Sequence, residues 1–264
     1  MLFANVKVGS DPEFFLTKDE KFIPAFKFLK GTKRKPTAID DQGSAVLHDN
    51  VMVEFNTIPA TTSKEFVVNI NKVLSHLRET IPKDVVFKFI PSASFDDEEL
   101  THRKALEFGC EPDFNAYQNG DKNTFSQPWD LNLRTSGGHI HVGYDNPRKE
   151  VNLHLIRSMD LHLGLPSLFL DTEGDKRREM YGKAGAFRHK PYGCEYRVLS
   201  NFWIKSDELK EWAFNSTIAS ANFIDNGMRL SDRDIAQLEY AINESDKNVA
   251  KSLLEKFHIE IPNL

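Results

Sequence analysis

The chain has 264 residues, of which 40% are hydrophobic and 28% are charged, and its formal net charge is −5. This composition supports one domain, or two closely packed ones, and it excludes disordered and collagen-like classes of protein. The acidic balance argues against broad nucleic-acid binding, which needs clustered basic charge. The sequence has no signal-peptide pattern, no apolar run of bilayer-spanning length and no CxxC pair, so we expect a soluble protein of the cytoplasm.

The first strand-like segments carry acidic residues on one face. In GSDPEFFL, Asp11 and Glu13 are two residues apart and therefore share one face of an extended chain. In VMVEFNT (51–57), the valines and Phe55 share one face and leave Glu54 on the other. Each segment thus has an apolar face for a core and an opposite face that presents carboxylates.

Two helices are expected before the last third of the chain. Apolar residues recur at three- and four-residue steps over 64–80, which predicts an amphipathic helix. Residues 151–166 have a similar pattern, which Pro166 is expected to interrupt. We interpret KGTKRKP (30–36) as a solvated surface loop rather than a phosphate-binding one. Two further loops are expected, at 41–44 and 118–128.

Two later strand-like segments repeat the design of one apolar and one polar face. In GGHIHVGY, His139 and His141 share one face, and glycines on both sides favour the close approach of a ligand or a neighbouring backbone. In GCEYRVLS, Glu195 and Arg197 align opposite Cys194. We expect Cys194 to be a buried hydrophobe without a catalytic role.

These four polar faces together favour a shared metal site. Taken singly, each has an ordinary explanation, since one glutamate on a strand is usually solvated and one strand histidine is usually structural. Four independent solvent faces would more naturally carry Lys, Thr and Ser. Carboxylates outnumber histidines and no cysteine shares these faces, so the ligand set favours Mg²⁺ or Mn²⁺ over a structural zinc. Such ions commonly bridge carboxylates and nucleotide phosphates.

A basic segment with several glycines, KRREMYGKAGAFRHKPYGCEYR, leads into the strand of Glu195. It contains neither a P-loop nor a dinucleotide-binding fingerprint. We interpret Lys176 and Arg177 as ordinary surface residues. The residues predicted to clamp a phosphate or carboxylate group are Arg178, Lys183 and Arg188.

Helical patterns dominate the end of the chain. Ser206 is expected to cap a helix whose first turn is acidic. Ser231 and Asp234 form the pattern of a capping box at the start of the next helix. A short last helix is expected over 247–257.

Together these motifs resemble those of the glutamine synthetase / glutamate–cysteine ligase superfamily, most closely the small phage-type COOH–NH2 ligases, or amidoligases. The resemblance covers roughly residues 8–205, and FGCEPDFNAY (108–117) resembles a signature of the phage branch. Four motifs in the order of the family are specific, although each alone is weak. Two features depart from the family pattern: Asp11 stands at a position where the family has Glu, and Pro12 follows it.

The resemblance implies a role for each polar face. The implied metal ligands are Asp11, Glu13, Glu54, His139 and Glu195. Nucleotide contacts are assigned to His141, Lys183, Arg178 and Arg188. The implied catalytic positions are Arg188 near phosphate, Arg197 at the reacting acyl phosphate, and Glu54.

The implied fold is α+β, with a curved, largely antiparallel sheet of the glutamine synthetase-like catalytic type and helices on its outer face. Residues 1–205 would form the catalytic domain, and residues 206–264 a helical segment packed on the same domain. The implied reaction is ATP-dependent joining of a carboxylate to an amine through an acyl phosphate, with ATP and Mg²⁺ or Mn²⁺ as cofactors. The substrates would be small molecules or peptides, without membrane or broad nucleic-acid partners, and a homo-oligomer is compatible with this reading.

Two other functions remain open at this stage. A metal-dependent hydrolase is one, because HxH also occurs in barrel amidohydrolases. In those barrels HxH ends the first strand and regular βα alternation follows, whereas here HxH lies mid-chain without that alternation. The other is a non-catalytic protein that retains the fold and binds nucleotide or metal.

Overall fold

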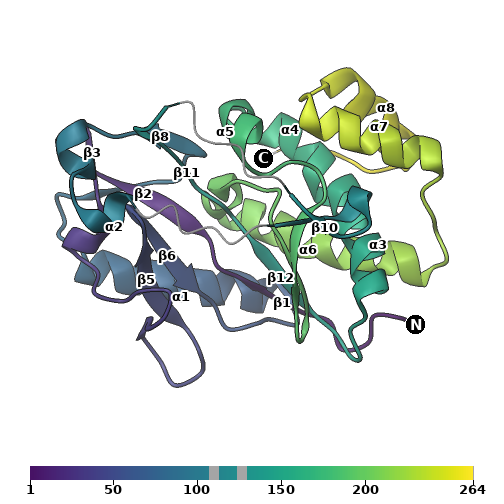
Figure 1. The fold of residues 1–264 in the computed structure, drawn as a ribbon. Coiled ribbons are helices and arrows are strands. Elements are labelled where there is room, and N and C mark those ends of the chain that lie inside the picture. The colour runs from purple at the N-terminus through teal and green to yellow at the C-terminus, as the bar shows by residue number, and fades with distance from the viewer. Residues whose placement is uncertain (107–112, 124–129, 264) are drawn as a thin grey trace.

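Two antiparallel sheets and a layer of helices make up the fold of the chain (Figure 1). The structure is a computed structural model that describes residues 1–106, 113–123 and 130–263. The expected α+β class with antiparallel strands and C-terminal helices is confirmed. Cys110 and residues 108–112 of the phage-type signature lie outside the described residues.

The first sheet joins three of the predicted polar strands. Its order is β1-β12-β14-β13-β9-β10, and every pair is antiparallel. Its strands are β1 (Lys7–Ser10), β9 (Phe114–Asn115), β10 (Asp121–Lys122), β12 (Ile140–Gly143), β13 (Ala186–Lys190) and β14 (Gly193–Tyr196). The register places His141 between Gly9 and Glu195, and Arg188 opposite Glu195 on the other side. Residues about 50 positions apart in the sequence therefore become direct neighbours.

The second sheet carries the remaining predicted polar strand. Its order is β3-β2-β6-β5-β4, and β7 also pairs with β2. Its strands are β2 (Glu13–Lys18), β3 (Lys21–Ile23), β4 (Thr37–Ala38), β5 (Ala45–Asp49), β6 (Met52–Asn56) and β7 (Val86–Lys88). The register places Glu13 directly opposite Glu54. A separate two-stranded ribbon pairs β8 (Ser92–Ser94) with β11 (Leu133–Thr135).

The two sheets are joined where β1 runs on into β2. After β6, the chain continues to pair along this junction: the Thr57 N–H donates to the Ser10 carbonyl oxygen at 3.1 Å, and Val8 pairs with Ala60. The segment from β1 through β2 therefore has the continuation of β6 along one edge, and β12 lies along the other edge of β1. The junction brings the polar residues of both sheets close together.

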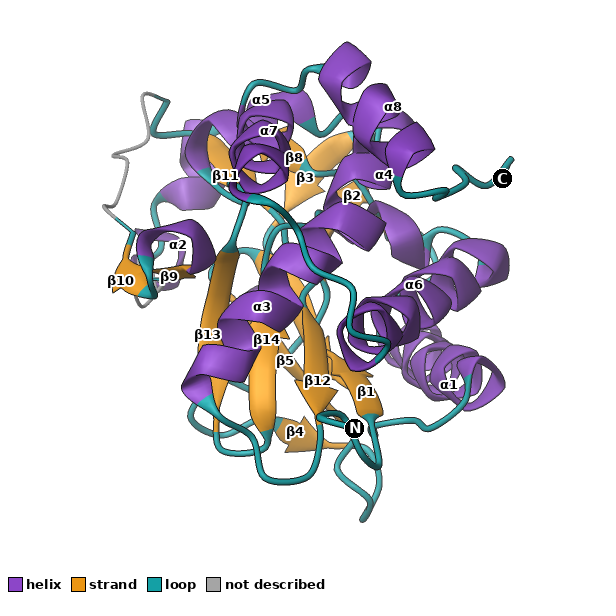
Figure 2. Cartoon of the chain, turned by 90° about the vertical axis from the view of Figure 1, so that its right-hand side faces the viewer, coloured by secondary structure: helices purple, strands orange, loops and turns teal. Residues whose placement is uncertain are grey.

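Helices cover one side of these sheets. In Figure 2, α3 lies across β12, β14 and β13, and α6 and α1 lie beside it. The α-helices are α1 (Ser63–Thr80), α2 (Arg103–Leu106), α3 (Lys149–Met159), α4 (Leu165–Leu170), α5 (Asp175–Met180), α6 (Asp207–Asp225), α7 (Asp232–Asn243) and α8 (Lys247–Lys256). One hydrophobic core spans the sheets and this helix layer, and Cys194 is buried in it as predicted.

The helix predicted over 64–80 is confirmed as α1. Thr62 caps it by accepting a hydrogen bond from the Glu65 N–H at 3.2 Å. Phe66 and Ile70 are fully buried on its inner face. The spacing of apolar residues was sufficient to predict this helix, because helix-forming contacts are local.

The expected interruption at Pro166 is wrong. A π-helical turn, Asp160–Gly164, connects α3 directly to α4, and Pro166 lies in the first turn of α4. The wider turn lets the helix pass from α3 to α4 without ending.

The C-terminal helices begin where their caps predict. Ser206 caps α6, and Ser231 and Asp234 form a reciprocal capping box at α7. α6 packs against α1 and α3, and α7 packs against α8. The division of the chain at residue 205 stays a prediction.

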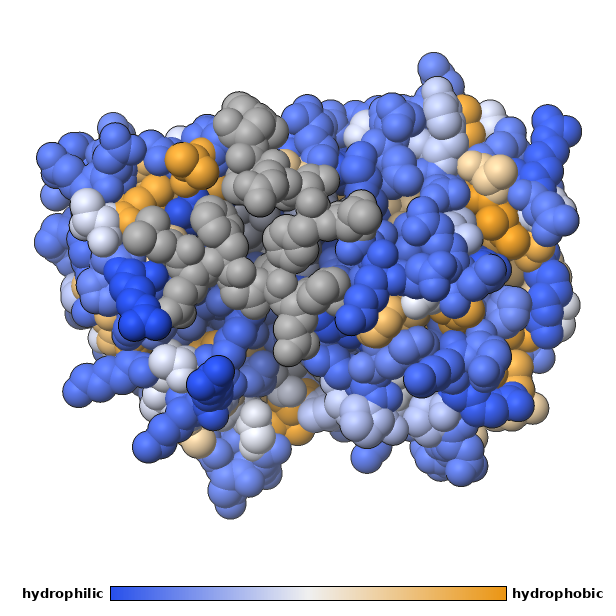
Figure 3. All heavy atoms as spheres, viewed as in Figure 1, coloured by the Kyte–Doolittle hydropathy of each residue, from blue (hydrophilic) through white to orange (hydrophobic). Residues whose placement is uncertain are grey.

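Figure 3 shows that the face seen in Figure 1 is mainly hydrophilic, with apolar residues in small separate groups. Exposed large hydrophobic residues among the described residues include Val68 in α1, Tyr240 in α7 and Leu131 in the turn before β11. None of the described helices combines the length and apolarity that a membrane span requires.

Candidate active site

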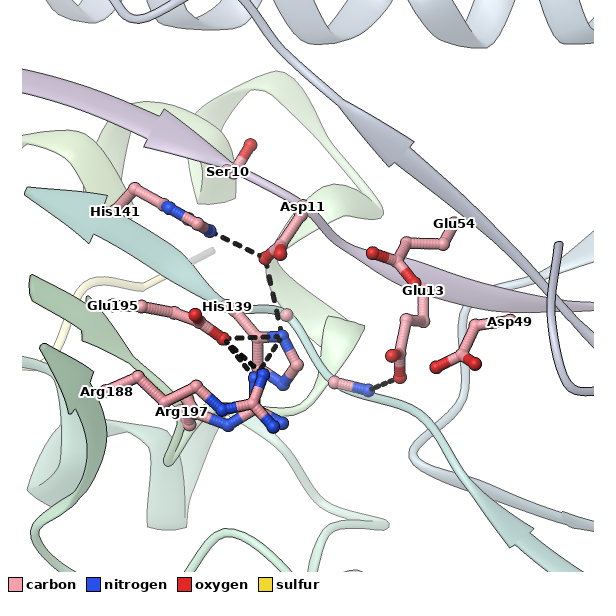
Figure 4. Close-up of polar contacts among 12 residues, drawn as sticks. Ser10, Asp11, Glu13, Asp49, Glu54, His139, His141, Arg188, Glu195 and Arg197 are labelled. Atoms are coloured by element: carbon pink, nitrogen blue, oxygen red, sulfur yellow. Dashed lines mark hydrogen bonds and ion pairs between the residues drawn. The ribbon is translucent and has the colours of Figure 1, made fainter. Parts of the chain in front are cut away.

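Asp11, His141 and Glu195 form a first cluster at the junction of the sheets (Figure 4). One donor atom of each lies within 4.8 Å of the other two, and Asp11 Oδ1 lies 3.0 Å from His141 Nε2. His141 and Glu195 are cross-strand partners, and Asp11 directly follows β1. The sheet register therefore brings the three side chains together.

Glu13, Asp49 and Glu54 form a second cluster, whose donor atoms also lie within 4.8 Å of one another. Glu13 and Glu54 stand opposite each other on β2 and β6, and Asp49 ends β5. One Glu13 oxygen accepts a hydrogen bond from the Gly137 N–H at 2.8 Å. Like charges directly opposite on neighbouring strands are unfavourable unless a cation lies between them.

Pro12 separates these two clusters. The spacing of Asp11 and Glu13 predicted one shared face, but the chain leaves the first sheet after Ser10 and enters the second at Glu13. Pro12 has no N–H to continue a strand ladder, so the regular alternation breaks at this point. Each of the two acidic residues therefore belongs to a different cluster.

His139 lies at the edge of the first cluster, just before β12. Its Nδ1 atom is 3.3 Å from Asp11 Oδ1 and 3.7 Å from Glu195 Oε1. The backbone before His139 runs close to the backbone at Ser200. A Cβ on Gly138 would lie only 2.3 Å from the Ser200 carbonyl oxygen. Only glycine allows this approach, which agrees with the close contact predicted from the sequence.

Arg197 contacts four different groups with its guanidinium, one of which is His139 Nδ1 at 3.3 Å. It donates to Glu195 and to the Tyr181 hydroxyl, and its Nε lies 2.7 Å from Asp113 Oδ1. Arg188 lies beside it, with Nη1 3.7 Å from Glu195 Oε1 and Nε 3.8 Å from Asp113 Oδ1. The two predicted arginines thus lie together, and both face the first cluster.

The charges of the first cluster depend on one another. Burial alone raises the pKa of Asp11, but the two histidines outweigh it and hold that pKa well below its usual value. Burial lowers the pKa of His141, yet Asp11 and Glu195 produce a net rise. Burial and then Arg197 lower the pKa of His139 well below its usual value. His139 is therefore neutral beside an anionic Asp11, as a metal-binding imidazole must be.

The second cluster brings three carboxyl groups close together in a largely buried place. Burial, followed by the charge of Asp49, raises the pKa of Glu13 to about 7. Burial and then Asp11 raise the pKa of Glu54 well above its usual value. Glu54 Oε2 is buried and has no hydrogen-bond partner within the described part of the chain. The nearest ammonium group is that of Lys33, 3.9 Å away.

The structure places the other basic candidates outside both clusters. Arg178 donates to Ser245 Oγ at 3.1 Å, and Lys183 Nζ donates to the Asn243 carbonyl oxygen at 3.2 Å. Both residues thus tie the segment around α5 to the end of α7, and their nucleotide contacts stay a prediction. Arg177, predicted to be a surface residue, is buried and donates to the Val198 carbonyl oxygen at 2.7 Å.

A cavity of about 360 Å³ opens beside the first cluster. His141 and Tyr192 line one side of it, and Ser10, Thr57 and Pro59 line another. The Tyr192 hydroxyl is hydrogen-bonded to His141 Nδ1. The cavity therefore reaches a side chain of the cluster directly.

One cluster member, Asp49, and two residues beside the clusters, Asp113 and Lys33, were not predicted from the sequence. Asp49 shares a hairpin with Glu54, so pairing of the flanking strands could have indicated it. Asp113 lies in the 108–117 signature, whose chemistry the sequence does not reveal. Lys33 lies in the segment expected to be an ordinary solvated loop.

The donor set fits hard divalent cations. Carboxylate oxygens dominate, a histidine nitrogen completes the first cluster, and no described cysteine belongs to either cluster. The unpartnered oxygen of Glu54 and the Glu13–Glu54 pair both call for positive charge. This arrangement can hold divalent cations beside two arginines.

Comparison with known proteins identifies the family. Residues 117–263 match the family described as phage phiEco32-like COOH.NH2 ligase type 2, and the chain belongs to this family of COOH–NH2 ligases. The resemblance to phage-type ligases predicted from the motifs is thus confirmed.

Individual known proteins resemble the chain only distantly. No curated protein matches the chain. Among the solved structures that match is a bifunctional glutathione synthetase from Pasteurella multocida, with 10% sequence identity and a TM-score of 0.42. The alignment covers 97% of this chain and 49% of that chain, so this chain spans about half the length of that structure.

Proposed function

We propose that the protein is an ATP-dependent carboxylate–amine ligase that forms an amide bond through an acyl phosphate. The observation that carries this proposal is the pair of acidic clusters on either side of Pro12, with Arg188 and Arg197 facing the first. Membership of a COOH–NH2 ligase family supports the bond that is formed. The substrates would be a carboxylate and an amine of small-molecule or peptide origin.

The two clusters would hold Mg²⁺ or Mn²⁺. Asp11, His141 and Glu195 would bind one ion, with His139 at the edge of this group. Glu13, Asp49 and Glu54 would bind another, and the additional ligand Asp49 extends the set predicted from the sequence. When bound, such ions offset the charge of nucleotide phosphates during transfer.

Arg188 and Arg197 would offset negative charge on the substrate that the metal ions do not contact. Arg188 and Arg197 come from adjacent strands and are held near Asp113, so their guanidinium groups are oriented before a substrate binds. Oriented cations stabilise charge that develops on a transferring phosphoryl group and on a tetrahedral centre. The planar fork of arginine suits both groups.

The cavity beside His141 would receive the nucleotide. It has a volume of about 360 Å³ and adjoins the first cluster, where the phosphates would have to lie. Gly143 and Pro59 restrict its walls, while Ser10 and Thr57 supply hydroxyl groups. This arrangement supports the prediction that His141 lies beside the nucleotide.

The test is ATP turnover in the presence of candidate carboxylates and amines. We expect ADP and phosphate to form only with both co-substrates and with Mg²⁺ or Mn²⁺, and excess EDTA to stop the reaction. Glu13→Gln keeps the side-chain shape but removes an anionic ligand, so it should abolish turnover without loss of folding. Glu239→Gln on α7 is the matched control and should be fully active.

The other functions give different results in this assay. A hydrolase would cleave its substrate without ATP, and a binding protein would bind nucleotide or metal without turnover. Full activity in EDTA would remove the metal ions from the mechanism. Comparing metabolites and proteins from cells that express wild-type and Glu195→Ala chains, by mass spectrometry, would identify the product.

A further inference from the structure

The basic segment 30–36 forms a small, anchored hairpin. Thr32 and Lys35 exchange two backbone hydrogen bonds of 3.0 Å, so Lys33 and Arg34 occupy the tip of the turn. Gly31 fixes its base against β5: its carbonyl oxygen accepts from the His48 N–H at 3.0 Å. A Cβ on Gly31 would lie 2.4 Å from the Val46 carbonyl oxygen, so this packing requires glycine. The hairpin therefore presents its tip at a defined place.

Lys33 reaches from this tip into the second cluster. Its Nζ lies 2.5 Å from Asp49 Oδ2 and 3.9 Å from Glu54 Oε2. The side chain is still 43% exposed, whereas those of Asp49 and Glu54 are only 12% and 10% exposed. A partly exposed ammonium thus enters an acidic cluster whose own groups are largely enclosed.

Lys33 pairs closely with only one of the three carboxyl groups of this cluster. Glu13, Asp49 and Glu54 supply three carboxyl groups, and Glu54 Oε2 has no hydrogen-bond partner among the residues described. A half-exposed ion pair contributes little to stability, so its loss costs little. A divalent ion supplies more charge and takes several oxygen ligands at once.

We infer that Lys33 holds the cation position of the Glu13–Asp49–Glu54 cluster when no metal ion is there, and that a divalent ion displaces it and frees the tip of the hairpin. This inference rests on the proposed function for the metal-binding role of the cluster. The displaced Lys33 leaves a basic hairpin tip beside the loaded cluster. Binding of the second ion thus becomes coupled to the conformation of residues 31–37.

The coupling has a direct consequence for metal affinity. Every ion that enters the second cluster competes with Lys33, just as an ion in the first cluster would compete with Lys190, whose Nζ lies 2.7 Å from Glu195 Oε2. The affinity of the second cluster is therefore lower than its three carboxylates alone would give. Removing the ammonium of Lys33 should raise this affinity.

The experiment titrates Mn²⁺ alone into the full chain and follows binding by calorimetry and by electron paramagnetic resonance. Lys33→Gln removes the charge and keeps most of the side-chain length, and Arg34→Gln at the same turn is the matched control. We expect two classes of site in the wild type. In Lys33→Gln one of the two classes should bind about tenfold more tightly, as the loss of one nearby competing charge implies, while Arg34→Gln should match the wild type.

Hydrogen exchange provides a readout that does not depend on activity. Saturating Mn²⁺ should accelerate amide exchange over residues 31–37 in the wild type, because the tip loses its contact with Asp49. In Lys33→Gln, exchange should already be fast and should not respond to Mn²⁺. Thermal unfolding of both variants should remain close to the wild type, since the tip is exposed.

The outcomes separate this inference from the proposed function. If Lys33→Gln leaves both affinities unchanged, or if Mn²⁺ saturates two sites while the hairpin stays protected, the displacement is wrong and the metal-dependent ligase stands. The displacement is also wrong if the wild type has a single Mn²⁺ site that Glu195→Gln abolishes and Lys33→Gln leaves unaltered. If Mn²⁺ binds to none of these proteins, both the inference and the metal role in the proposed function are overturned.

Discussion

Arg197 is held from three sides, by Glu195, Tyr181 and Asp113. Arg197→Lys keeps one positive charge but has no planar fork to make these contacts together. If Arg197 acts in the transition state, kcat should fall by about 100-fold or more while the affinity for ATP changes little. Single-turnover ADP release and thermal unfolding, measured on one preparation, test this. A stable variant with the wild-type kcat would end the catalytic assignment.

Asp113 provides a second prediction at this scale. Its carboxylate lies between Arg197 and Arg188, so Asp113→Asn removes the anion that orients both guanidinium groups. We expect kcat to fall by about tenfold or more with KM for ATP nearly unchanged, because misaligned donors lose transition-state contacts. Asp113→Glu should recover part of the loss. Equal effects of both substitutions on folding alone would show that Asp113 is merely structural.

At the residue scale, the sequence was informative where alternation is regular. His141, Glu195 and Arg188 share one polar region because each lies on a simple antiparallel strand. Asp11 and Glu13 were assigned to one face, because a sequence pattern does not show that Pro12 carries the chain between sheets. Lys33 was missed since a lysine in a polar loop has no pattern that distinguishes solvation from an ion pair.

The π-helical turn between α3 and α4 carries a buried acidic residue, Asp160, that joins several elements. Its carboxylate accepts from the Tyr196 hydroxyl at 2.7 Å, from the Tyr117 hydroxyl at 2.9 Å and from the Gly185 N–H at 2.7 Å. These groups belong to β14, to the turn after β9 and to the start of β13. One carboxylate therefore links the helix layer to the sheet that carries the first cluster.

Replacing this carboxylate should weaken the protein. In Asp160→Asn the new amide nitrogen cannot accept a hydrogen bond. At least one of the three buried groups that donate to Asp160 therefore loses its acceptor. We expect a loss of about 2 kcal/mol, which for a chain of this size lowers Tm by about 4–8 °C. Differential scanning calorimetry measures this shift. Tyr117→Phe removes only one of the three contacts and should cost less.

Asp160 also predicts a pH dependence. Burial raises its pKa from 3.8 to about 7, against the opposing effect of its hydrogen bonds. The folded state therefore binds more protons than the unfolded state between these two values, and stability should decrease as the pH rises through this window. The unfolding free energy of the wild type should decline more steeply from pH 5 to pH 7 than that of Asp160→Asn. Parallel pH profiles would contradict this.

At the scale of elements, local signals predicted the helices well. Caps and apolar periods are set by residues within one or two turns, which is why α1, α6 and α7 begin where expected. The passage from α3 to α4 was mispredicted because the effect of Pro166 depends on its position in a turn. The pairing of β2 with β6 and of β1 with β12 joins distant residues, and no local signal encodes it.

The helical end of the chain is part of the common core. Phe214 of α6 contacts Phe66 of α1, with ring centroids 5.7 Å apart, and the Ser158 hydroxyl of α3 donates to the Ser220 carbonyl oxygen at 2.9 Å. A chain ending at Lys205 would expose the apolar faces of α1 and α3. We expect it to aggregate or to lack cooperative unfolding, whereas a chain ending at Ile261 should fold normally. A soluble, cooperatively unfolding product ending at Lys205 would show that residues 1–205 are an independent domain.

The whole-molecule architecture was predictable in class and not in detail. Alternating strands followed by capped helices indicate an α+β protein, and the order of the motifs indicated the family. That the polar strands belong to two sheets was not predictable, because the junction depends on contacts between residues 8–12 and 55–60.

The junction between the two sheets fixes the distance between the two acidic clusters. Asp11 and Glu13 belong to different sheets, yet only Pro12 separates them, so their Cα atoms are held within about 7 Å of each other. Any shift of one sheet against the other changes the angle between the two clusters far more than their separation. Substrate-driven bending of the molecule would therefore reorient two bound charges about a nearly constant distance. An additional residue beside Pro12 would lengthen the chain between Asp11 and Glu13, and no movement of the sheets could restore the original spacing.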